Sequence, residues 1–238
     1  AIFEEVRSGK AEYEVAVGGT GSPRFQLQIP AASNAAYTQR ANTLPAYIGA
    51  GNKIKPGETV VDYGAGLGLG SKHLGDKVVT LEPFFDKLGD FKPDFSQPDA
   101  SDLVAALEGK VDVVVNNLVL NVVPPDTRAQ VVQVIGQLLK PGGRAYITTR
   151  ATSDVNAAKN KKDAKLEKGG WIVSPGTPRE TYQKGFNQAE LEGTVIDALG
   201  PGFTATRSDY GVNGNPQVEI NKLATQPATK AASKHQLS

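Results

Sequence analysis

Two acidic residues flank a glycine-rich turn in the first half of this sequence. Asp62 stands two residues before Gly64 in the run Asp62-Tyr-Gly-Ala-Gly-Leu-Gly-Leu-Gly70, and Glu82 follows Gly64 by eighteen residues. Glycines allow a ligand to lie against bare backbone, where a Cβ atom would clash. A carboxylate at the end of the following strand can accept both hydroxyls of a ribose. These residue types at this spacing therefore predict a site for a nucleoside-containing ligand.

A strand, a turn and a helix are expected to position these residues. A β-branched run predicts a buried strand over 59–63, and leucines at helical spacing predict a helix over about 67–75. A second apolar run predicts a strand over 77–81, which ends at Glu82. Such a unit directs backbone N–H groups and a helix N-terminus at whatever lies above the carboxyl end of the first strand.

The kind of nucleoside ligand follows from the order of the glycines. A dinucleotide fingerprint, G-x-G-x-x-G, does not fit, because its third glycine would fall at Leu69 counted from Gly64 and at Ser71 counted from Gly66. The alternation of one acid with three glycines, followed by Glu82, resembles motif I and the next acidic position of the class I S-adenosylmethionine-dependent methyltransferases. A glycine turn without a ligand and an NAD site are the alternatives.

The resemblance covers roughly residues 40–223, because later landmarks follow in the order of that family. Residues 111–115 form a near-continuous apolar run, as expected of a parallel strand that is buried on both faces. Asp126 is expected to cap the next helix, whose apolar positions recur at helical spacing up to Leu139. The run LLKPGGRAYITT (138–149) is a frequent form of the join between this helix and the next strand in class I methyltransferases.

The fold implied is α/β, with a doubly wound, mostly parallel seven-stranded sheet of the class I methyltransferase type. A short strand is expected near 91–95, and the terminal part is expected to hold a helix over 187–199 and strands over 203–210 and 217–223. Two alternating runs joined by a glycine-rich turn predict an N-terminal β-hairpin. The expected organisation is a hairpin appendage over 1–33, a Rossmann-like domain over 34–223 with an insertion over 151–185, and a flexible tail over 224–238.

The resemblance also implies S-adenosylmethionine as the cofactor and a set of residues around it. Those expected to bind the cofactor are Asp62, Gly64, Ala65, Gly66, Gly68, Glu82, Pro83, Asp99, Ala100 and Asn116. The expected catalytic residues follow the fourth strand, where the family keeps its substrate-facing motif, and they are Asn116, Asn117 and Asn121. DNA amino-methyltransferases carry Asp/Asn-Pro-Pro-aromatic there, whereas here Asn-Leu-Val follows Asn116, and Pro124-Pro125 come later.

The methyl acceptor is less well determined by the sequence. Residues 144–184 carry nine Lys and Arg against four acids, a local charge of +5 on a chain of +1. Arg150, Trp171, Tyr182 and Lys184 are expected to bind the substrate, by stacking on and clamping an extruded base or an anionic molecule. This pattern slightly favours a nucleic acid over a small molecule. Solvated charge and a packing role for Trp171 are the alternatives.

The second hypothesis is that the protein is a binding or structural module that keeps this fold but catalyses no methyl transfer. The cleft residues include no recognisable acceptor motif, and the fold alone would serve a binding or structural module. The segment LVLNVVPP (118–125) resembles the corresponding segment of small-molecule methyltransferases and of methyltransferase-like proteins of phage, mobile-element or DNA-modification origin. Transfer of label from the cofactor to any acceptor distinguishes the enzyme from the module.

Composition excludes several other chemistries. Cysteine is absent, which removes disulfides, thiolate zinc sites and cysteine nucleophiles, and the two histidines, His73 and His235, form no metal-binding pattern. No metal site is therefore predicted. No apolar run approaches transmembrane length and no signal-peptide pattern occurs, so the sequence predicts a soluble cytoplasmic protein that does not interact with membranes.

Overall fold

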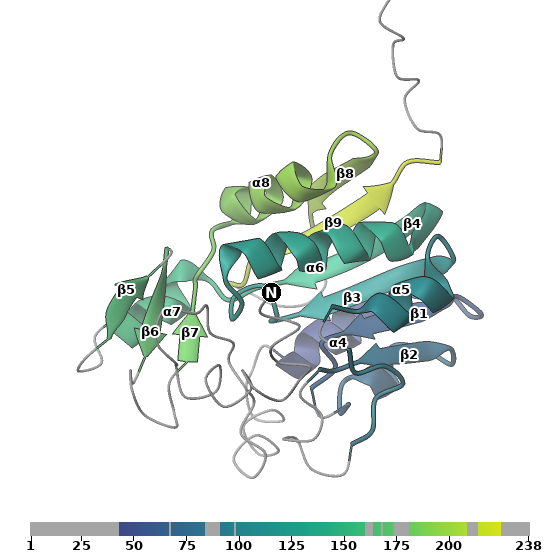
Figure 1. Cartoon of the computed structure of the whole chain (residues 1–238), viewed down its shortest axis with the longest axis horizontal. Coiled ribbons are helices and arrows are strands. Elements are labelled where there is room, and N and C mark those ends of the chain that lie inside the picture. Colours follow the sequence, from purple (N-terminus) through teal and green to yellow (C-terminus); the bar gives the residue numbers. More distant parts are fainter. Residues whose placement is uncertain are drawn as a thin grey trace, which may run out of the picture.

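A central mixed sheet forms the framework of the molecule (Figure 1). The computed structural model describes residues 43–66, 68–83, 91–97, 99–159, 164–167, 169–173, 181–208 and 214–224. The predicted N-terminal hairpin and all but the first residue of the predicted tail lie outside the described residues. Within the described ranges, no helix combines the length and the apolar character that crossing a bilayer requires.

The sheet has the order β2-β1-β3-β4-β9-β8. Its four parallel strands are β1 (Val60–Tyr63), β2 (Val78–Leu81), β3 (Val111–Asn117) and β4 (Leu139–Thr148). Two antiparallel strands complete it, β8 (Phe203–Arg207) and β9 (Gln217–Lys222). The mostly parallel α/β sheet expected from the sequence is confirmed. The chain leaves β1 toward β2 on one side and reaches β3 on the other, so the carboxyl ends of β1 and β3 form a topological switch point.

The seventh strand expected near 91–95 is reduced to a single bridge between Leu81 and Phe95. The Phe95 N–H donates to the Thr80 carbonyl (3.0 Å), and the Glu82 N–H donates to the Phe95 carbonyl (3.1 Å). Pro93 has no N–H to donate, and the Asp94 carboxylate accepts the Thr80 N–H instead (2.8 Å). The described residues therefore form six strands in this sheet rather than seven.

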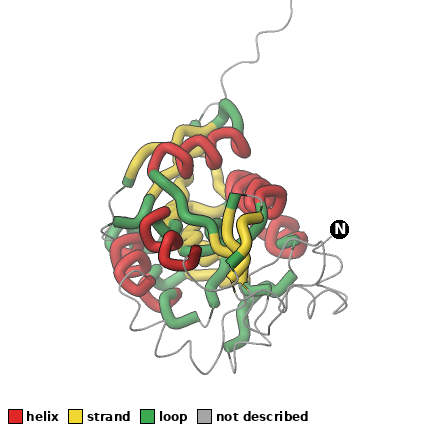
Figure 2. Tube along the Cα trace, turned by 90° about the vertical axis from the view of Figure 1, so that its left-hand side faces the viewer, coloured by secondary structure: helices red, strands yellow, loops and turns green. Residues whose placement is uncertain are grey.

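Helices cover both faces of the sheet, as Figures 1 and 2 show. On one face lie α5 (Ser101–Leu107), α6 (Pro125–Leu138) and α8 (Gln188–Leu199), and on the other lies α4 (Thr43–Gly51). Successive strand residues point to opposite faces. Val61 accordingly packs into the core under α5, α6 and α8, while its neighbour Val60 packs with Tyr47 of α4.

Two helix predictions are corrected by the structure. The helix expected over 67–75 is only one 3-10 turn, η1 (Ser71–His73), because Gly66 and Gly68 adopt positive φ angles of 57° and 69° that no helix continues. Asp126 does not cap α6. Pro124 occupies the cap position without a side-chain hydrogen bond, and a proline follows at the first helical position, where its fixed φ suits the helix.

The join between α6 and β4 is tighter than expected. Helix α6 ends at Leu138, and Leu139 already pairs with Val111 of β3. Arg144 is the next paired residue of β4, opposite Val113, so residues 140–143 bulge out of the ladder with Gly142 at a φ of 78°.

The insertion over 151–185 contains structure that the sequence did not predict. Helix α7 (Thr152–Lys159) is followed by a separate antiparallel sheet of β5 (Lys165–Glu167), β6 (Gly170–Val173) and β7 (Thr181–Gln183). Trp171 of β6 packs against Val155 of α7 and so joins the small sheet to its helix. Figure 1 shows this insertion beyond the carboxyl ends of β3 and β4.

Candidate functional site

The glycine turn and Glu82 meet at the carboxyl ends of β1 and β2. The N–H groups of Gly64 and Ala65 donate to the Leu81 carbonyl at 2.9 and 3.0 Å, and the Gly66 N–H donates to Glu82 Oε2 at 2.8 Å. Glu82 is 8% exposed. The two features that the sequence singled out, eighteen residues apart, are therefore in direct contact, while Pro83 is half-buried next to them.

Side chains at the glycine positions would not fit. Gly64 has a φ of 85°, and a Cβ there would lie 2.4 Å from Val119 Cγ2. A Cβ at Gly68 would lie 2.2 Å from the Phe91 ring. Val119 and Phe91 thus pack directly against the backbone of the turn, and the close approach and the positive φ angles explain why these two positions are glycine.

Asp62 faces away from the turn, toward α4 and η1. Its carboxylate is fully buried and accepts hydrogen bonds from the Tyr47 hydroxyl (3.0 Å) and the Ser71 hydroxyl (2.6 Å). Burial raises the pKa of Asp62 to about 7, the two hydrogen bonds oppose this increase, and the nearby Glu82 charge adds to it. Asp62 therefore joins the glycine turn to α4 and holds it in place.

The residues after β3 combine strain with unsatisfied polar atoms. The Asn116 amide donates from Nδ2 to the Tyr63 carbonyl (3.0 Å), which fixes its orientation, and its buried Oδ1 has no partner among the described residues. Leu118 adopts a φ of 61°, rare for a side-chain-bearing residue. Asn121 is 1% exposed, and its Oδ1 also has no partner in the described chain. Asn117, between them, is 7% exposed.

Asp99 and Ala100 lie beside the end of β1. Asp99 Oδ1 accepts the Ser101 N–H at 3.1 Å, and Ala100 is fully buried with a φ of 56° at the start of α5. Burial raises the pKa of the Tyr63 hydroxyl, and the charge of Asp99 adds to the effect. The structure thus brings Asp99 to the carboxyl edge of β1, where the resemblance places the adenine.

The four expected substrate-binding residues are engaged with the protein itself. Arg150 donates to Gln183 Oε1 (3.2 Å), and Lys184 pairs with Glu190 while its ammonium lies 4.7 Å from the centre of the Phe186 ring. Tyr182 is 2% exposed, and Trp171 is half-buried. In this arrangement Tyr182 offers no open ring face, so its predicted stacking role has no support from the geometry and stays a prediction.

Arg128 is a site residue that the sequence reasoning missed. It is 5% exposed and donates to the carbonyls of Leu120 and Val123, both at 2.9 Å. Its guanidinium lies 5.0 Å from the centre of the Phe186 ring, and burial lowers its pKa while a hydrogen bond with Tyr182 opposes the change. Arg128 therefore fixes the loop that follows β3. A charged residue on the apolar stripe of α6 was the signal available in the sequence.

The predicted basic patch is not one surface. Arg144 lies at the opposite edge of the sheet, where it forms an ion pair with Glu58 (2.8 Å). Lys184 is neutralised by Glu190, while Lys165 of β5 is exposed. Within the described ranges no group of three His, Asp or Glu side chains is placed to hold a metal ion.

Sequence comparison identifies a relationship over most of the chain. A profile described as a methyltransferase domain matches residues 35–192. A search of curated proteins found no relative.

Solved structures share the fold at low sequence identity. An N1-methyltransferase for 1,6-didemethyltoxoflavin from Burkholderia thailandensis, with S-adenosylhomocysteine bound, is 16% identical with a TM-score of 0.56, covering 94% of this chain and 91% of that one. An amino pentose methyltransferase from Micromonospora echinaspora, with S-adenosylmethionine bound, is 14% identical with a TM-score of 0.54, covering 80% and 96%. A methyltransferase from Clostridium acetobutylicum is 11% identical with a TM-score of 0.56, covering 82% and 98%.

Proposed function

Because the chain belongs to the class I S-adenosylmethionine-dependent methyltransferase family, we propose that it transfers the methyl group of S-adenosylmethionine to a small molecule. The observation that carries the proposal is the contact between the Gly66 N–H and the Glu82 carboxylate at the carboxyl ends of β1 and β2. It brings a backbone donor and a ribose-binding acid together above β1.

The residues around this contact fit the cofactor. Glu82 accepts the ribose hydroxyls, and the Gly66 N–H that donates to Glu82 holds its carboxylate at the turn. Asp99 and Pro83 border the adenine, and Asn116 Oδ1, buried without a partner in the described chain, accepts a hydrogen bond from a donor of the cofactor or the acceptor. The bound cofactor supplies a methyl group already activated on a sulfonium, so the protein mainly aligns the acceptor with it.

Asn116, Asn117 and Asn121 are proposed to hold the acceptor at the end of β3. Carboxamide oxygens accept hydrogen bonds but supply no strong base, so they orient a nucleophile rather than deprotonate it. Arg128 fixes the loop from which Asn121 projects, through the Leu120 and Val123 carbonyls. It is a positioning residue, not a catalytic one.

A small acceptor agrees better with the structure than a nucleic acid does. Of the charges that favoured a nucleic acid, Arg144 lies at the opposite edge of the sheet and is paired with Glu58, and Lys184 is paired with Glu190. Lys161, Lys162, Lys168 and Arg179 lie outside the described residues. The described part of the insertion also lies beyond the carboxyl ends of β3 and β4 (Figure 1).

Calorimetric titration tests the cofactor first. We expect S-adenosylmethionine and S-adenosylhomocysteine to bind and NAD to give no heat. The opposite result, NAD binding without a response to the two sulfur nucleosides, contradicts the proposal. Incubation with labelled cofactor and fractionated cell extract then tests turnover. We expect label in a small-molecule fraction, whereas tight binding with no transfer to any fraction favours the binding module.

A salt series tests the acceptor class. Binding to a nucleic acid through several phosphates falls steeply with salt, by roughly 0.7–0.9 in log K per contact for each log unit of salt. We expect no binding of single- or double-stranded oligonucleotides at low salt. Salt-sensitive binding that is weakened by changing Lys159, Lys161, Lys162 and Lys165 to Gln would favour a nucleic acid as the methyl acceptor.

A further inference from the structure

A cavity of about 390 Å³ lies beyond the carboxyl end of β4, on the side away from the glycine turn. Its walls come from residues 151–153, 186–188, 207–208 and 214–217. Pockets that hold small ligands have volumes of roughly 300–1,000 Å³. The cavity is therefore large enough for part of a small molecule, and nothing in the methyl-transfer site described above uses it.

Two helices begin side by side at this cavity. Ala151 and Phe186 form a parallel bridge, in which the Phe186 N–H donates to the Arg150 carbonyl (2.9 Å) and the Thr152 N–H to the Phe186 carbonyl (3.1 Å). Helix α7 starts at Thr152 and α8 at Gln188, immediately after this bridge. The first N–H groups of a helix have no partner within it and carry partial positive charge. Part of this capacity is already used, because the Asp154 N–H donates to the Ala151 carbonyl (3.1 Å) and the Glu190 N–H donates to Asn187 Oδ1 (2.8 Å). The partial positive charge of both helix ends still lies at this cavity.

Among the described residues, the ionisable lining of the cavity is positive. Arg207 is exposed at its rim, and no Asp or Glu is among the described residues that line it. The acids in the first turns of the two helices are Asp154 and Glu190, and Glu190 is paired with Lys184. Lys53 adds a second cation nearby, since its Nζ lies 3.5 Å from the Ser208 hydroxyl.

Asn215 supplies an observation that is independent of the helix ends. Its side chain is 8% exposed and belongs to the cavity wall, and its amide Nδ2 has no hydrogen-bond partner among the described residues. A buried donor without a partner destabilises the folded chain, and such a group in a native structure needs an explanation. An acceptor oxygen bound in the cavity provides one.

We propose that this cavity binds the anionic group of the small acceptor, a carboxylate or a phosphate, and so anchors that molecule beside the methyl-transfer site. Helix N-termini, a guanidinium and an amide N–H together present only donors and positive charge, which is the chemistry that recognises these anions. The identity of the ligand as the acceptor rests on the proposed function, whereas the binding of an anion does not.

Titration of the full chain with inorganic phosphate and with acetate tests the site. Both are compared with chloride at equal ionic strength, by NMR shifts and by the unfolding temperature. We expect saturable binding of at least one of the two anions, and the tighter one identifies the group. Arg207→Gln is expected to weaken this binding about fivefold to tenfold. Asn215→Leu is expected to weaken it without lowering the unfolding temperature, because no existing hydrogen bond of Nδ2 is lost.

Lys77→Gln is the matched control, since it removes an exposed cation at the start of β2. Equal weakening by Lys77→Gln and Arg207→Gln, or no binding beyond that of chloride, overturns the site. An affinity that Asn215→Leu leaves unchanged also overturns it, because the anion then sits on the surface at Arg207 alone.

Two further measurements separate this inference from the proposed function. We expect S-adenosylhomocysteine to bind the Arg207→Gln variant as tightly as it binds the unaltered chain. If it binds neither protein, the proposed function is contradicted but the anion site is not. Phosphate or acetate at saturation is expected to inhibit transfer of label to the small-molecule fraction. Transfer that proceeds unaffected by the bound anion overturns the role of the cavity as an acceptor anchor.

Discussion

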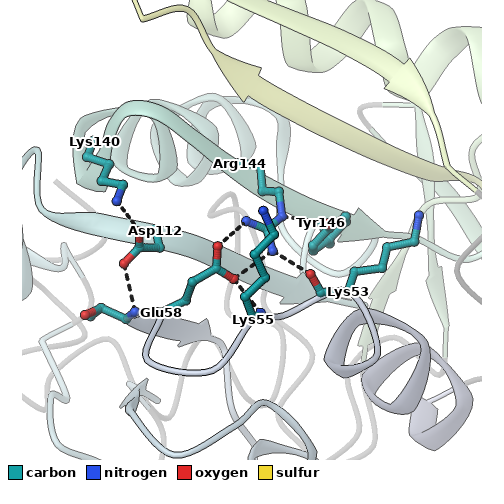
Figure 3. A network of polar contacts seen from close by, with 8 residues as sticks. Lys53, Lys55, Glu58, Asp112, Lys140, Arg144 and Tyr146 are labelled. Atoms are coloured by element: carbon teal, nitrogen blue, oxygen red, sulfur yellow. Dashed lines mark hydrogen bonds and ion pairs between the residues drawn. The ribbon is translucent and has the colours of Figure 1, made fainter.

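The amino-terminal and carboxyl-terminal edges of the central sheet, where its parallel strands begin and end, differ in how their polar groups are paired. At the amino-terminal edge the Arg144 guanidinium donates to both Glu58 oxygens (2.8 and 2.9 Å), to the Lys53 carbonyl (2.6 Å) and to the Tyr146 hydroxyl (2.8 Å). Figure 3 shows this network together with the neighbouring pair of Asp112 and Lys140. Arg144 and Lys140 there are each paired with an acid, Glu58 and Asp112.

The carboxyl-terminal edge leaves comparable groups incomplete. Burial holds a proton on Asp62 up to a pKa of about 7, and the Oδ1 atoms of Asn116 and Asn121 have no partners in the described chain. Leu118 is held at a positive φ beside them. Satisfied networks stabilise a fold, whereas strained and unsatisfied groups persist where a ligand completes them. We infer that the amino-terminal edge serves stability and the carboxyl-terminal edge serves binding.

The largest expected effect lies at the satisfied edge. Arg144→Ala leaves the Glu58 carboxylate, whose side chain is 15% exposed, without its partner. We expect the free energy of unfolding to fall by about 2–4 kcal/mol, measured by urea denaturation. Affinity for S-adenosylhomocysteine is expected to change less than twofold. The control is Lys110→Ala, an exposed cation for which we expect at most about 0.5 kcal/mol. An equal loss in both variants contradicts the comparison.

Glu82→Ala is the corresponding change at the binding edge. We expect affinity for S-adenosylhomocysteine to weaken by about 1–3 kcal/mol in calorimetry, because the ribose hydroxyls lose a charged acceptor. The free energy of unfolding is expected to fall less, since the Gly66 N–H that loses its partner is a neutral donor, whereas Arg144→Ala leaves a charged carboxylate without its partner. Glu108→Ala, at an exposed position, serves as the control. If Glu82→Ala lowers the free energy of unfolding but leaves the affinity unchanged, the carboxyl-terminal edge serves stability rather than binding.

The free energy of unfolding at acid pH is expected to depend on Glu58. Hydrogen bonds and charge from Arg144 lower the pKa of Glu58 from 4.5 to about 2, despite the opposing effect of burial. A lowered pKa stabilises the fold above the ordinary value, and this stability is lost as pH falls from about 5 toward 2. We expect a loss of about 1–3 kcal/mol over this window after allowing for solvent screening. Glu58→Gln is expected to remove this slope, and an unchanged slope contradicts the assignment.

Asp62 is expected to produce the opposite slope. Its pKa is raised from 3.8 to about 7, so the folded form keeps the proton that the unfolded chain releases. The contribution of Asp62 to the free energy of unfolding is then fully present below pH 3.8 and is lost as pH rises to about 7, by about 1–3 kcal/mol. Asp62→Asn keeps the shape and removes the titration. We expect its unfolding free energy to be flatter from pH 4 to 7.5 than that of the unaltered chain. Parallel profiles would show that Asp62 ionises normally.

The smallest expected effect concerns Asn121. Asn121→Leu replaces a buried oxygen that has no partner among the described residues, so the free energy of unfolding is expected to stay equal or to rise by up to about 1 kcal/mol. Transfer of label is expected to be lost. Asn116→Leu is the matched comparison, because it also breaks the hydrogen bond to Tyr63 and is expected to cost about 1 kcal/mol. Destabilisation by Asn121→Leu beyond that value would show that this oxygen is already satisfied.

The amino-acid sequence by itself determined the elements whose patterns are long and local. The apolar run at 111–115 became β3, and the helix expected over 187–199 became α8 with Asn187 as its cap. The order of the glycine turn and Glu82 also predicted that both lie at the carboxyl ends of neighbouring strands. These predictions are correct because hydrophobic periodicity and glycine geometry depend on neighbouring residues and not on distant parts of the chain.

Only the tertiary structure decided what each polar side chain contacts. Burial raises the pKa of Asp62 to about 7, although the hydroxyls of Tyr47 and Ser71, from two different elements, donate to its carboxylate and oppose the increase. Arg128 supports the loop after β3, and Tyr182, expected to stack on a substrate, is buried against it. Burial, pKa and hydrogen-bond partners depend on segments far apart in the sequence, so local pattern carries no record of them. The cavity at Asn215 is a product of such packing as well.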